Sequence, residues 1–384
     1  MRVLLVGGGT AGHINPAIAI GNFIRKSEKN AQILYIGAVG GMEEKLVTKA
    51  GFKLKTITIS GFDRKVSLEA VKKNFLTLKR LITSIAESKK IIKDFSPDIC
   101  IGTGGYVSGP VLKAAQTMGI KTIIHEQNAL PGVTTRLLSK KVDCVMIATE
   151  IARKYLNGSD IRVTGNPIRE DILSYDKESA KKLLNFDERP VILSFGGSLG
   201  SIKINSAVAG LIAHTVSKGA KYQHIHAYGH CNGEEFLELL KNKGVDLKKH
   251  KNLIIEKYVD MPKCLAAADL IISRSGAITI SELQAAGKAS ILIPSPNVAE
   301  NHQYHNAMQL AYKKAAKVIE EEHLTNRVLI DTVEDMFENR DALNIFSKNA
   351  KKMAIPDSDK KIYDIIKEVV KKTNSTGASK VGHC

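Results

Sequence analysis

Cysteine, aromatic residues and long apolar runs are all scarce in this sequence. The five cysteines are scattered, odd in number and without a C-x-x-C pair, which argues against both a disulfide framework and a cysteine-based metal site. No apolar run approaches the roughly 18 residues that a membrane-spanning helix needs. The apolar stretch at the start, which ends at Gly7, is too short for the core of a signal peptide, so we expect the protein to stay in the cytosol.

Positive charge is what the sequence has in excess. The formal net charge is +17 over 384 residues, which fits a polyanionic partner such as nucleic acid, anionic lipid or a phosphorylated substrate. Residues 64–93 carry nine Lys or Arg against two Glu, so part of this charge is clustered. The chain length favours two domains, because a single core seldom extends over so many residues.

Alternating strands and helices are expected along the whole chain. In the first half the strands are expected at 2–6, 33–36, 55–59, 98–101, 121–124, 142–147 and 161–164. In the second half they are expected at 191–195, 222–227, 252–256, 270–272, 289–293 and 317–319. Helical spacing between many of these runs predicts an α/β protein with two doubly wound parallel sheets.

The pattern restarts after a polar connector at 170–190. We therefore predict an N-terminal domain over 1–166, a hinge at Asn166-Pro167 and a C-terminal domain over 167–350. An apolar face on residues 357–372 predicts a last helix that packs back on the first domain. Residues 373–384 are expected to be disordered.

Each predicted domain begins with a strand, a glycine loop and a helix. In the first domain Gly7, Gly9 and Gly12 form G-x-G-x-x-G, the fingerprint of dinucleotide binding. A nicotinamide-binding unit also needs an acidic residue at the end of the next strand, where this sequence has Gly37-Ala38. An oxidoreductase that uses these glycines is therefore a disfavoured alternative. The second loop is GGSLGS, at 196–201.

The predicted helix over 67–94 is amphipathic and rich in lysine. A stripe at spacings of three and four is expected to pack on the sheet, and it consists of Leu68, Val71, Phe75, Leu78, Ile82 and Ile85. Leu76 and Ile91 are expected to point away from the sheet. The basic residues around them are Lys72, Lys73, Lys79, Arg80, Lys89 and Lys90, which Arg136, Lys140 and Lys141 could extend. Such a surface suits anionic lipid headgroups. A nucleic-acid surface is the weaker alternative, because aromatic residues are 5% of the chain and none interleaves with these lysines.

A strand, a polar turn and a helix over 277–286 follow one another in the second half. Gly287 is placed to end this helix, and a second helix is expected to start near Asn301. The carboxyl end of a strand next to a helix start favours an anion such as a phosphate. Glu282 in the first helix suits a pair of ribose hydroxyls, and Gln303 in the second suits sugar hydroxyls.

Seven motifs, in order along residues 1–370, closely resemble those of the MurG family. They are GGGTAGHINP near the start, GTGGYVSGP at 102–110, HEQNALPG at 125–132, TGNPIR at 164–169, GGSLGS at 196–201, RSGAITISE at 274–282 and ENHQYHNA at 300–307. The sequence departs from the family pattern at Ala11, where many members have Gly, and at His302, where some members have a second Gln.

The resemblance implies the GT-B fold, in which two Rossmann-like domains face a cleft. It also implies the inverting transfer of N-acetylglucosamine (GlcNAc) from UDP-GlcNAc to the C4 hydroxyl of MurNAc in lipid I, which is undecaprenyl-pyrophosphoryl-MurNAc-pentapeptide. The product is lipid II, for peptidoglycan synthesis. A peripheral enzyme on the cytoplasmic face of the cell membrane is expected, without a metal or other cofactor, and with other cell-wall enzymes as possible partners.

Carried over residue by residue, the resemblance implies substrate contacts in both domains. In the first domain they are Thr10, Ala11, Gly12 and Asn128. In the second they are Arg169, Ser198, Val259, Ala277, Ile278, Thr279, Ile280, Ser281, Glu282 and Gln303. Ser198 would lie near the diphosphate, Val259 would present its backbone to uracil, and Glu282 would bind the ribose. Gln303 would reach the GlcNAc hydroxyls.

The reaction that the resemblance implies needs a base, for which His13 and Glu126 compete. His13 directly follows the first glycine loop, and an ordinary histidine pKa near ~6.5 suits the task. Its rival role is to hydrogen-bond the acceptor's pyrophosphate. Tyr106 is expected to position the acceptor rather than act as the base. Ser198 and free N–H groups at the helix start would stabilise the leaving diphosphate.

Three other functions stay open at this point. The chain could transfer a different UDP-sugar to a different lipid. It could be the nicotinamide oxidoreductase considered above, or a nucleic-acid-binding protein without catalytic activity.

Overall fold

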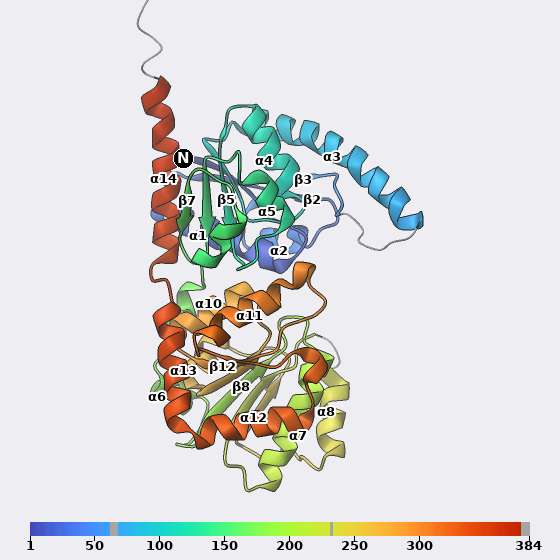
Figure 1. The fold of residues 1–384 in the computed structure, drawn as a ribbon, viewed down its shortest axis with the longest axis vertical. Helices are drawn as coiled ribbons and strands as arrows, with labels where there is room; N and C mark the ends of the chain where they lie inside the picture. The colour runs from blue at the N-terminus through green and yellow to red at the C-terminus, as the bar shows by residue number, and fades with distance from the viewer. Residues whose placement is uncertain (62–67, 231–232, 378–384) are drawn as a thin grey trace, which may run out of the picture. The chain divides into compact units, whose positions relative to one another are not determined.

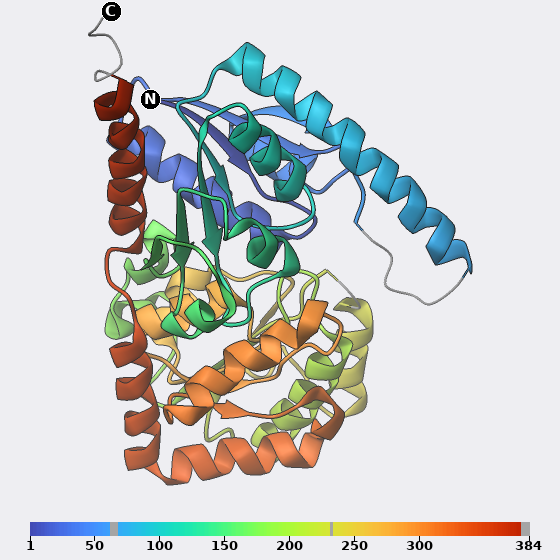
Figure 2. The same ribbon diagram turned by 45° about the horizontal axis from the view of Figure 1, so that its top comes forward.

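The computed structural model describes residues 1–61, 68–230 and 233–377, and for residues 68–79, 340 and 373–377 it describes the backbone alone. The chain divides into two compact units (Figures 1 and 2). Unit 1 is Met1–Ile168 with Pro356–Cys384, and unit 2 is Arg169–Ile355. Among the described residues no helix combines the length and the apolar character that crossing a bilayer requires.

Unit 1 is built on a parallel sheet in the order β3-β2-β1-β4-β5-β6-β7. Its strands are β1 (Arg2–Val6), β2 (Gln32–Ala38), β3 (Lys53–Ile57), β4 (Ile99–Gly102), β5 (Lys121–Glu126), β6 (Cys144–Ile147) and β7 (Ile161–Val163). Its helices are α1 (Ala11–Ser27), α2 (Glu43–Lys49), α3 (Leu68–Phe95), α4 (Ser108–Thr117), α5 (Val133–Leu138), the 3-10 helix η1 (Glu150–Tyr155) and α14 (Ser358–Gly377).

Helices cover both faces of this sheet. Neighbouring residues of a strand point to opposite faces, so they join different cores. Leu4 and Val6 of β1 join the core that lies under α3 and α4. Val3 and Leu5 join the core on the other face, which α1 and α14 cover. Figures 1 and 2 both show α14 beside α1. The last helix is therefore part of unit 1, although unit 2 separates it from the rest of that unit in the sequence.

Unit 2 contains a second parallel sheet, in the order β10-β9-β8-β11-β12-β13. Its strands are β8 (Val191–Phe195), β9 (Gln223–Ala227), β10 (Leu253–Glu256), β11 (Leu270–Ser273), β12 (Ala289–Leu292) and β13 (Lys317–Val318). Its α-helices are α6 (Lys177–Leu183), α7 (Ile202–Ser217), α8 (Gly233–Asn242), α9 (Met261–Ala267), α10 (Ala277–Ala286), α11 (His302–Tyr312), α12 (Asn326–Glu338) and α13 (Arg340–Met353). The 3-10 helices are η2 (Glu170–Leu173), η3 (Ala299–Asn301) and η4 (Glu321–His323).

Several helices of unit 2 are not predicted from the sequence. The polar connector predicted at 170–190 is wrong, because η2 and α6 lie there. The helices α12 and α13 were also not predicted. Polar caps begin all three α-helices: side-chain oxygens of Asp176, Thr325 and Asn339 accept backbone N–H groups of α6, α12 and α13. The capping signals for these three helices were therefore present in the sequence.

The inward face of α3 differs from the predicted stripe. Ile82 was expected in the core and is 68% exposed, whereas Ile91 was expected to point away and packs against the core. Ser84 and Ser88 are fully buried on this face, and each hydroxyl donates to a carbonyl of the helix itself. Small polar residues can thus form part of a helix's buried face without contributing to its apolar pattern. The side chains of Leu68, Val71, Lys72, Lys73, Phe75, Leu76, Leu78 and Lys79 lie outside the described residues.

The C-terminal helix also differs from its predicted extent. The helix α14 begins at Ser358 and continues through Gly377, so the prediction of disorder from residue 373 is wrong for its first five residues. Residues 378–384 lie outside the described part of the chain. In unit 1, Arg162 forms an ion pair with Glu368 of α14 at 2.5 Å, which adds a polar contact to the helix's apolar face.

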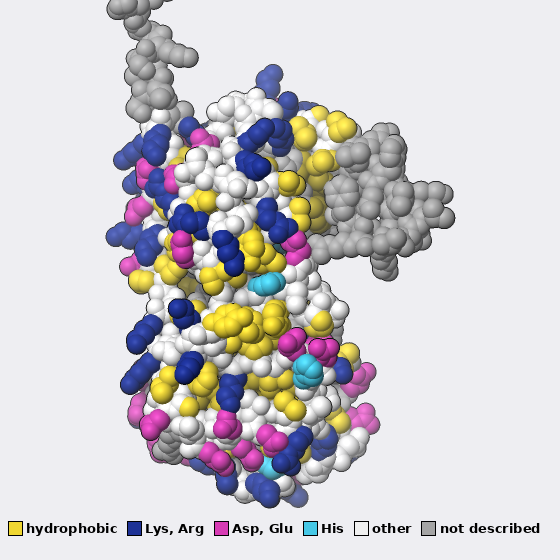
Figure 3. All heavy atoms as spheres, viewed as in Figure 1, with side chains coloured by type: hydrophobic (Ala, Val, Ile, Leu, Met, Phe, Trp, Pro, Cys, Tyr) yellow, Lys and Arg dark blue, Asp and Glu magenta, His cyan; other side chains and the backbone are white. Residues whose placement is uncertain are grey.

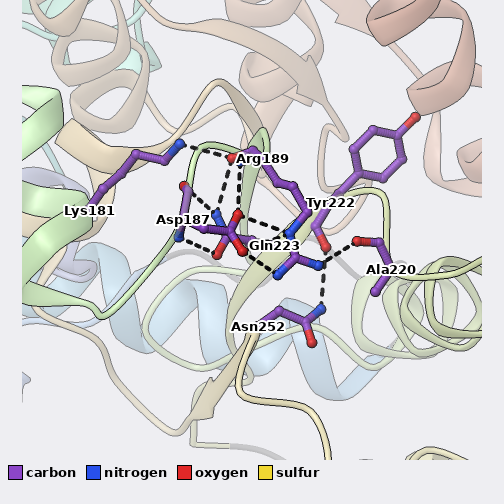
Figure 4. A network of polar contacts seen from close by, with 7 residues as sticks. All are labelled: Lys181, Asp187, Arg189, Ala220, Tyr222, Gln223 and Asn252. Carbon is purple, nitrogen blue, oxygen red and sulfur yellow. Dashed lines mark hydrogen bonds and ion pairs between the residues drawn. The ribbon is translucent and has the colours of Figure 1, made fainter.

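A polar network joins the amino-terminal ends of β8 and β9 (Figure 4). Gln223, the first residue of β9, donates to the carbonyls of Asp187 and Arg189, and the Arg189 guanidinium donates to the carbonyl of Ala220. Lys181 also donates to the Arg189 carbonyl. Ligands of open α/β sheets bind at the opposite, carboxyl ends of the strands, so we assign this network a structural role.

Candidate active site

Both sheets have a point where successive crossovers go to opposite sides, and ligands of open α/β sheets bind there. In unit 1 this point lies between β1 and β4, and in unit 2 between β8 and β11. The segments that follow these strands include Gly7–Thr10, Thr103–Val107, Gly196–Ser201 and Arg274–Gly276. All four belong to motifs that the sequence analysis singled out.

The first glycine loop of unit 1 interlocks with the loop that follows β4. The N–H of Gly8 donates to the carbonyl of Gly104 at 3.3 Å. Gly105 has a φ of +80°, and a Cβ placed there would lie 2.0 Å from the Gly8 carbonyl oxygen. Only glycine combines this left-handed backbone with such a close approach. The two loops therefore lie in direct backbone contact at the carboxyl ends of β1 and β4.

His13 lies in the first turn of α1, where its side chain lies next to Gly8 of the first loop and Gly104 of the second. Its Nδ1 is 3.2 Å from the carbonyl oxygen of Gly8 and 3.2 Å from Oγ1 of Thr10. The hydroxyl of Thr103 donates to the His13 carbonyl at 2.6 Å, so the backbone of the residue is also anchored. Since a carbonyl oxygen can only accept, a hydrogen bond between Nδ1 and Gly8 requires the tautomer that carries its proton on Nδ1. In that tautomer Nε2 is the basic nitrogen of the neutral ring.

The other candidate residues of the first glycine loop directly precede His13 in the chain. Thr10 is the N-cap position of α1, and Ala11 and Gly12 are its first two residues. Ala11 stands in the helix, where a Cβ is tolerated, so its departure from the family's glycine fits the fold. Tyr106, from the loop after β4, packs against Gly9: a Cβ on Gly9 would lie 2.8 Å from Cε1 of the ring. Burial raises the pKa of the Tyr106 hydroxyl, and the charge of Glu43 raises it further.

Glu126 ends β5 and has both carboxylate oxygens engaged. One oxygen accepts the backbone N–H and the side-chain amide of Asn128, at 3.0 and 3.1 Å. The other accepts the N–H of Gly132 at 3.1 Å. The side chain is 3% exposed. Through these hydrogen bonds Glu126 stabilises the loop between β5 and α5 and positions Asn128.

In unit 2 the second glycine loop carries Ser198, which is exposed. The hydroxyl of Tyr258 donates to the Ser198 carbonyl at 3.2 Å, which links this loop to the segment after β10 where half-buried Val259 lies. At the end of the loop, Ser201 caps α7 through its hydroxyl, which accepts the N–H of Ile204 at 3.3 Å. Ser198 and Val259 are thus brought to the same edge of the sheet.

Arg274 connects several segments at the carboxyl edge of this sheet, and the sequence did not predict this role. Its guanidinium donates to the Ser201 hydroxyl at 2.7 Å and to the carbonyls of Ile293 and Pro294. It also forms a largely buried ion pair with Glu321. One side chain therefore ties together the ends of β11 and β12 and the start of α7. No local signal predicts this role, because Glu321 is distant in the sequence.

The start of α10 has neither a side-chain cap nor an acidic residue. Its N-cap is Gly276, so no side chain caps the helix, and its first turn, from Ala277, contains no acidic residue. Gly287 ends the helix with a φ of 63°, as predicted. Backbone N–H groups at an uncapped helix start favour negative charge. In the helix Ala277, Ile278, Thr279 and Ser281 are half-buried, whereas Ile280 is buried.

Glu282 lies in α10 and differs from an ordinary surface carboxylate. Burial raises its pKa to about 7, against the opposing charge of Arg169. Arg169 itself forms a bidentate contact with Asp171, at 3.0 and 2.7 Å. The structure therefore brings Arg169 and Glu282 into one electrostatic environment within unit 2. A carboxylate with few water contacts is suited to accept hydrogen bonds from a ligand.

Gln303 is placed in the first turn of α11, after the strand β12. Its Oε1 accepts the N–H of Ser295 at 2.9 Å, and its carbonyl accepts the hydroxyl of Ser275 at 2.8 Å. This orientation is fixed by the protein itself. His302, where the family pattern varies, contacts the Ala299 carbonyl through Nδ1 at 2.9 Å.

Comparisons with known proteins agree with this architecture. A model of the glycosyltransferase family 28 N-terminal domain matches residues 3–147, and one of the family's C-terminal domain matches residues 191–369. The chain belongs to glycosyltransferase family 28 and, within it, to the MurG family. The prediction from the seven motifs is confirmed, and so is the GT-B class of fold, with its two parallel α/β sheets.

Relatives and a solved structure match the MurG-family chain over almost its full length. A protein of Acetivibrio thermocellus is 44% identical over 97% of this chain and 99% of its own. One of Desulforamulus reducens is 42% identical over 97% of this chain and 98% of its own. Both are named UDP-N-acetylglucosamine–N-acetylmuramyl-(pentapeptide) pyrophosphoryl-undecaprenol N-acetylglucosamine transferase. The crystal structure of MurG from Acinetobacter baumannii superposes with a TM-score of 0.76 at 26% identity, covering 96% of this chain and 99% of that one.

Proposed function

We propose that this MurG-family chain transfers GlcNAc from UDP-GlcNAc to the C4 hydroxyl of MurNAc in lipid I, which yields lipid II for peptidoglycan synthesis. The observation that carries the proposal is full-length similarity, at 42–44% identity, to two proteins named for this transfer. The two family models match residues 3–147 and 191–369, ranges that contain both glycine loops and the Glu282 helix.

Unit 2 binds the donor in this proposal. Ser198 and the uncapped start of α10 hold the diphosphate, where fixed N–H groups stabilise the charge that develops as UDP leaves. Glu282 accepts hydrogen bonds from the ribose hydroxyls, and Val259 presents its backbone to uracil. Gln303, oriented by Ser295, contacts the GlcNAc hydroxyls. The remaining donor contacts are Arg169 and the residues of α10, which are Ala277, Ile278, Thr279, Ile280 and Ser281.

Unit 1 supplies the acceptor site and the base. The C4 oxygen of MurNAc bonds to the anomeric carbon of GlcNAc, its proton passes to Nε2 of His13, and the bond from that carbon to the UDP oxygen breaks with inversion. His13 is favoured over Glu126 as the base, because both Glu126 oxygens already accept hydrogen bonds from the protein. Tyr106 positions the acceptor. Thr10, Ala11, Gly12 and Asn128 complete the substrate contacts.

A transfer assay with radiolabelled UDP-GlcNAc and a lipid I analogue tests the proposal. We expect label in the lipid product with the wild-type protein, and loss of most turnover with retained UDP-GlcNAc binding in His13→Ala. Thermal shift against UDP, NADH and an oligonucleotide separates the alternatives, since a ligand stabilises the state that binds it. Stabilisation by NADH or oligonucleotide without UDP would sink the proposal, and transfer to other acceptors alone would redirect it to another lipid.

We further propose that unit 1 rests on an anionic membrane surface on the cytoplasmic side. Support comes from α5, where Leu137 is 74% exposed and Val133 48% exposed. The basic residues Arg136, Lys140 and Lys141 lie in or just after this helix. The helix packs beside α4, which packs beside α3 with its exposed Arg80 and Ile82. Figure 3 shows one face of the molecule, on which unit 1 carries Lys and Arg side chains among exposed hydrophobic ones.

Co-sedimentation with lipid vesicles tests this surface. The wild-type chain should bind vesicles containing anionic lipid more strongly than zwitterionic ones, and Leu137→Glu or Lys140→Glu with Lys141→Glu should weaken that binding several-fold. Tyr312→Ser in unit 2 is the matched control, because Tyr312 is an equally exposed apolar residue, at 79%. Equal losses in the control and the test variants would remove α5 from the membrane surface.

A further inference from the structure

A fully buried carboxylate, that of Glu43, lies against the first glycine loop. Glu43 begins α2, and its side chain has 0% exposure. Burying a carboxylate is costly unless hydrogen bonds compensate for the lost water. Oε1 accepts the N–H of Gly9 at 3.1 Å, whereas Oε2 is buried without a hydrogen-bond partner among the described residues. The burial of the Glu43 carboxylate therefore costs free energy that the hydrogen bond from Gly9 offsets only in part.

Three glycines make room for this carboxylate. A Cβ on Gly8 would lie 1.9 Å from Oε1 of Glu43, and one on Gly41 would lie 2.0 Å from Oε2. A Cβ on Gly37 would lie 2.7 Å from Cβ of Glu43. The absence of side chains at all three positions lets the carboxylate approach the loop's backbone directly.

One peptide group connects Glu43 to His13. The N–H of Gly9, which donates to Glu43, and the carbonyl of Gly8, which contacts Nδ1 of His13 at 3.2 Å, belong to the same peptide bond. In a trans peptide these two groups point in opposite directions. The carboxylate and the imidazole therefore hold the two ends of one planar unit. A negative charge on the N–H side strengthens the carbonyl as an acceptor, because consecutive hydrogen bonds polarise one another.

We propose that Glu43 is a positioning residue for the transfer reaction: through the Gly8–Gly9 peptide it orients His13 and keeps the proton on Nδ1, so that Nε2 faces the acceptor as the base. A carboxylate that orients a histidine directly is a known device of catalytic sites, and here a peptide group stands between the two. The inference rests on the proposed role of His13. Tyr35 supports the same loop by donating its hydroxyl to the Gly7 carbonyl at 2.7 Å.

Kinetics of Glu43→Gln test the proposal, since glutamine keeps the shape and removes the charge. We expect kcat to fall about 10- to 100-fold, the range for residues that orient a catalytic ligand, while KM for UDP-GlcNAc changes less than about twofold. Glu44→Gln is the matched control, because Glu44 also accepts a glycine N–H, that of Gly40 at 2.8 Å, from an exposed position. It should keep wild-type kcat.

A double variant separates this inference from the proposed function. If Glu43 acts through His13, adding Glu43→Gln to His13→Gln should cause little further loss of kcat. A full further loss would show that Glu43 acts independently and would overturn the inference. If His13→Gln alone kept full turnover, both proposals would fall. An inactive His13→Gln beside an unaffected Glu43→Gln would overturn the role of Glu43 only.

The tautomer of His13 can be measured in the wild-type protein. This measurement tests the proposal even if the Glu43 variants fail to fold. Nitrogen-15 NMR of histidine-labelled wild-type protein, with the His13 signals assigned by their absence in His13→Gln, distinguishes protonated Nδ1 from protonated Nε2. We expect the Nδ1–H form. An Nε2–H form in the wild-type protein would contradict the proposal.

Discussion

At the scale of single residues, Glu282 combines a carboxylate with an environment that disfavours its charge. Burial raises its pKa to about 7, while Arg169 opposes the shift. In the proposed donor site the ionised form accepts the ribose hydroxyls. The protonated form has lost part of that accepting capacity. Donor binding should therefore depend on pH near neutrality, which few carboxylates in proteins would cause.

We predict that affinity for UDP-GlcNAc falls about tenfold between pH 8 and pH 6, because protons compete for a carboxylate of pKa about 7. Glu282→Gln should bind the donor about 10- to 100-fold more weakly, as expected for hydrogen bonds to a charged group, and should lose this pH dependence. Isothermal titration calorimetry across the pH range measures both. An unchanged pH dependence in Glu282→Gln would assign the titration to another group.

At the scale of elements, the interlocked loops after β1 and β4 depend on backbone contact alone. Gly105 meets the Gly8 carbonyl so closely that a Cβ would lie 2.0 Å from its oxygen. Gly119, which follows α4 in the same unit, has a similar φ of +74° but nothing within 4 Å of its would-be Cβ. The pair therefore separates the strain of a left-handed backbone from the closeness of the two loops.

Gly119→Ala should lower stability by about 1–2 kcal/mol, the usual strain of a left-handed L-residue, and leave transfer activity intact. Gly105→Ala should lose more stability and most of its activity, because the added methyl group forces the two loops apart beneath His13. Thermal unfolding and the transfer assay, run on both variants, make the comparison. If the two variants behaved alike, the close approach of the loops would have no role in catalysis.

The same scale shows what a helix's sequence pattern leaves out. On α3 the buried face includes Ser84 and Ser88, and exposed Ile82 interrupts the expected apolar stripe. Serine hydroxyls can be satisfied by the helix's own carbonyls, so burial does not require an apolar residue. Periodicity located α3 along the chain but misassigned part of its inward face.

At the scale of the whole molecule, stability should depend on a buried pair of histidines in unit 2. The hydroxyl of Ser194 lies between Nε2 of His224, at 2.7 Å, and Nδ1 of His226, at 2.8 Å. Burial lowers the pKa of both histidines to about 3. The unfolded chain, with ordinary histidine pKa values near ~6.5, therefore binds more protons than the folded chain between these limits.

We predict that the free energy of unfolding decreases as the pH falls from about 6.5 to about 3, by up to about 1.4 kcal/mol per pH unit for each histidine. Replacing both with glutamine should flatten this slope, whatever it does to stability at pH 8. His323→Gln is the control, since its side chain is 71% exposed. Urea unfolding at several pH values measures the slopes, and equal slopes in all three proteins would exclude the pair as its cause.

The sequence by itself determined the strands, most of the helices near the site and the family. Strand Val191–Phe195 and helix Ala277–Ala286 have the predicted bounds, because apolar runs, glycines and helix ends are local properties of the chain. Ordered motifs such as RSGAITISE identify the MurG family for the same reason, because a motif is a local property of the chain.

Only the tertiary structure decided which side chains support the site. Glu43 meets the first glycine loop, and Arg274 meets Glu321, across long intervals of sequence. In the same way the fold assigned α14 to unit 1 and placed His224 and His226 around one serine hydroxyl. Such contacts depend on how distant segments pack and on which polar groups lose water there, and neither is written in any short stretch of the chain.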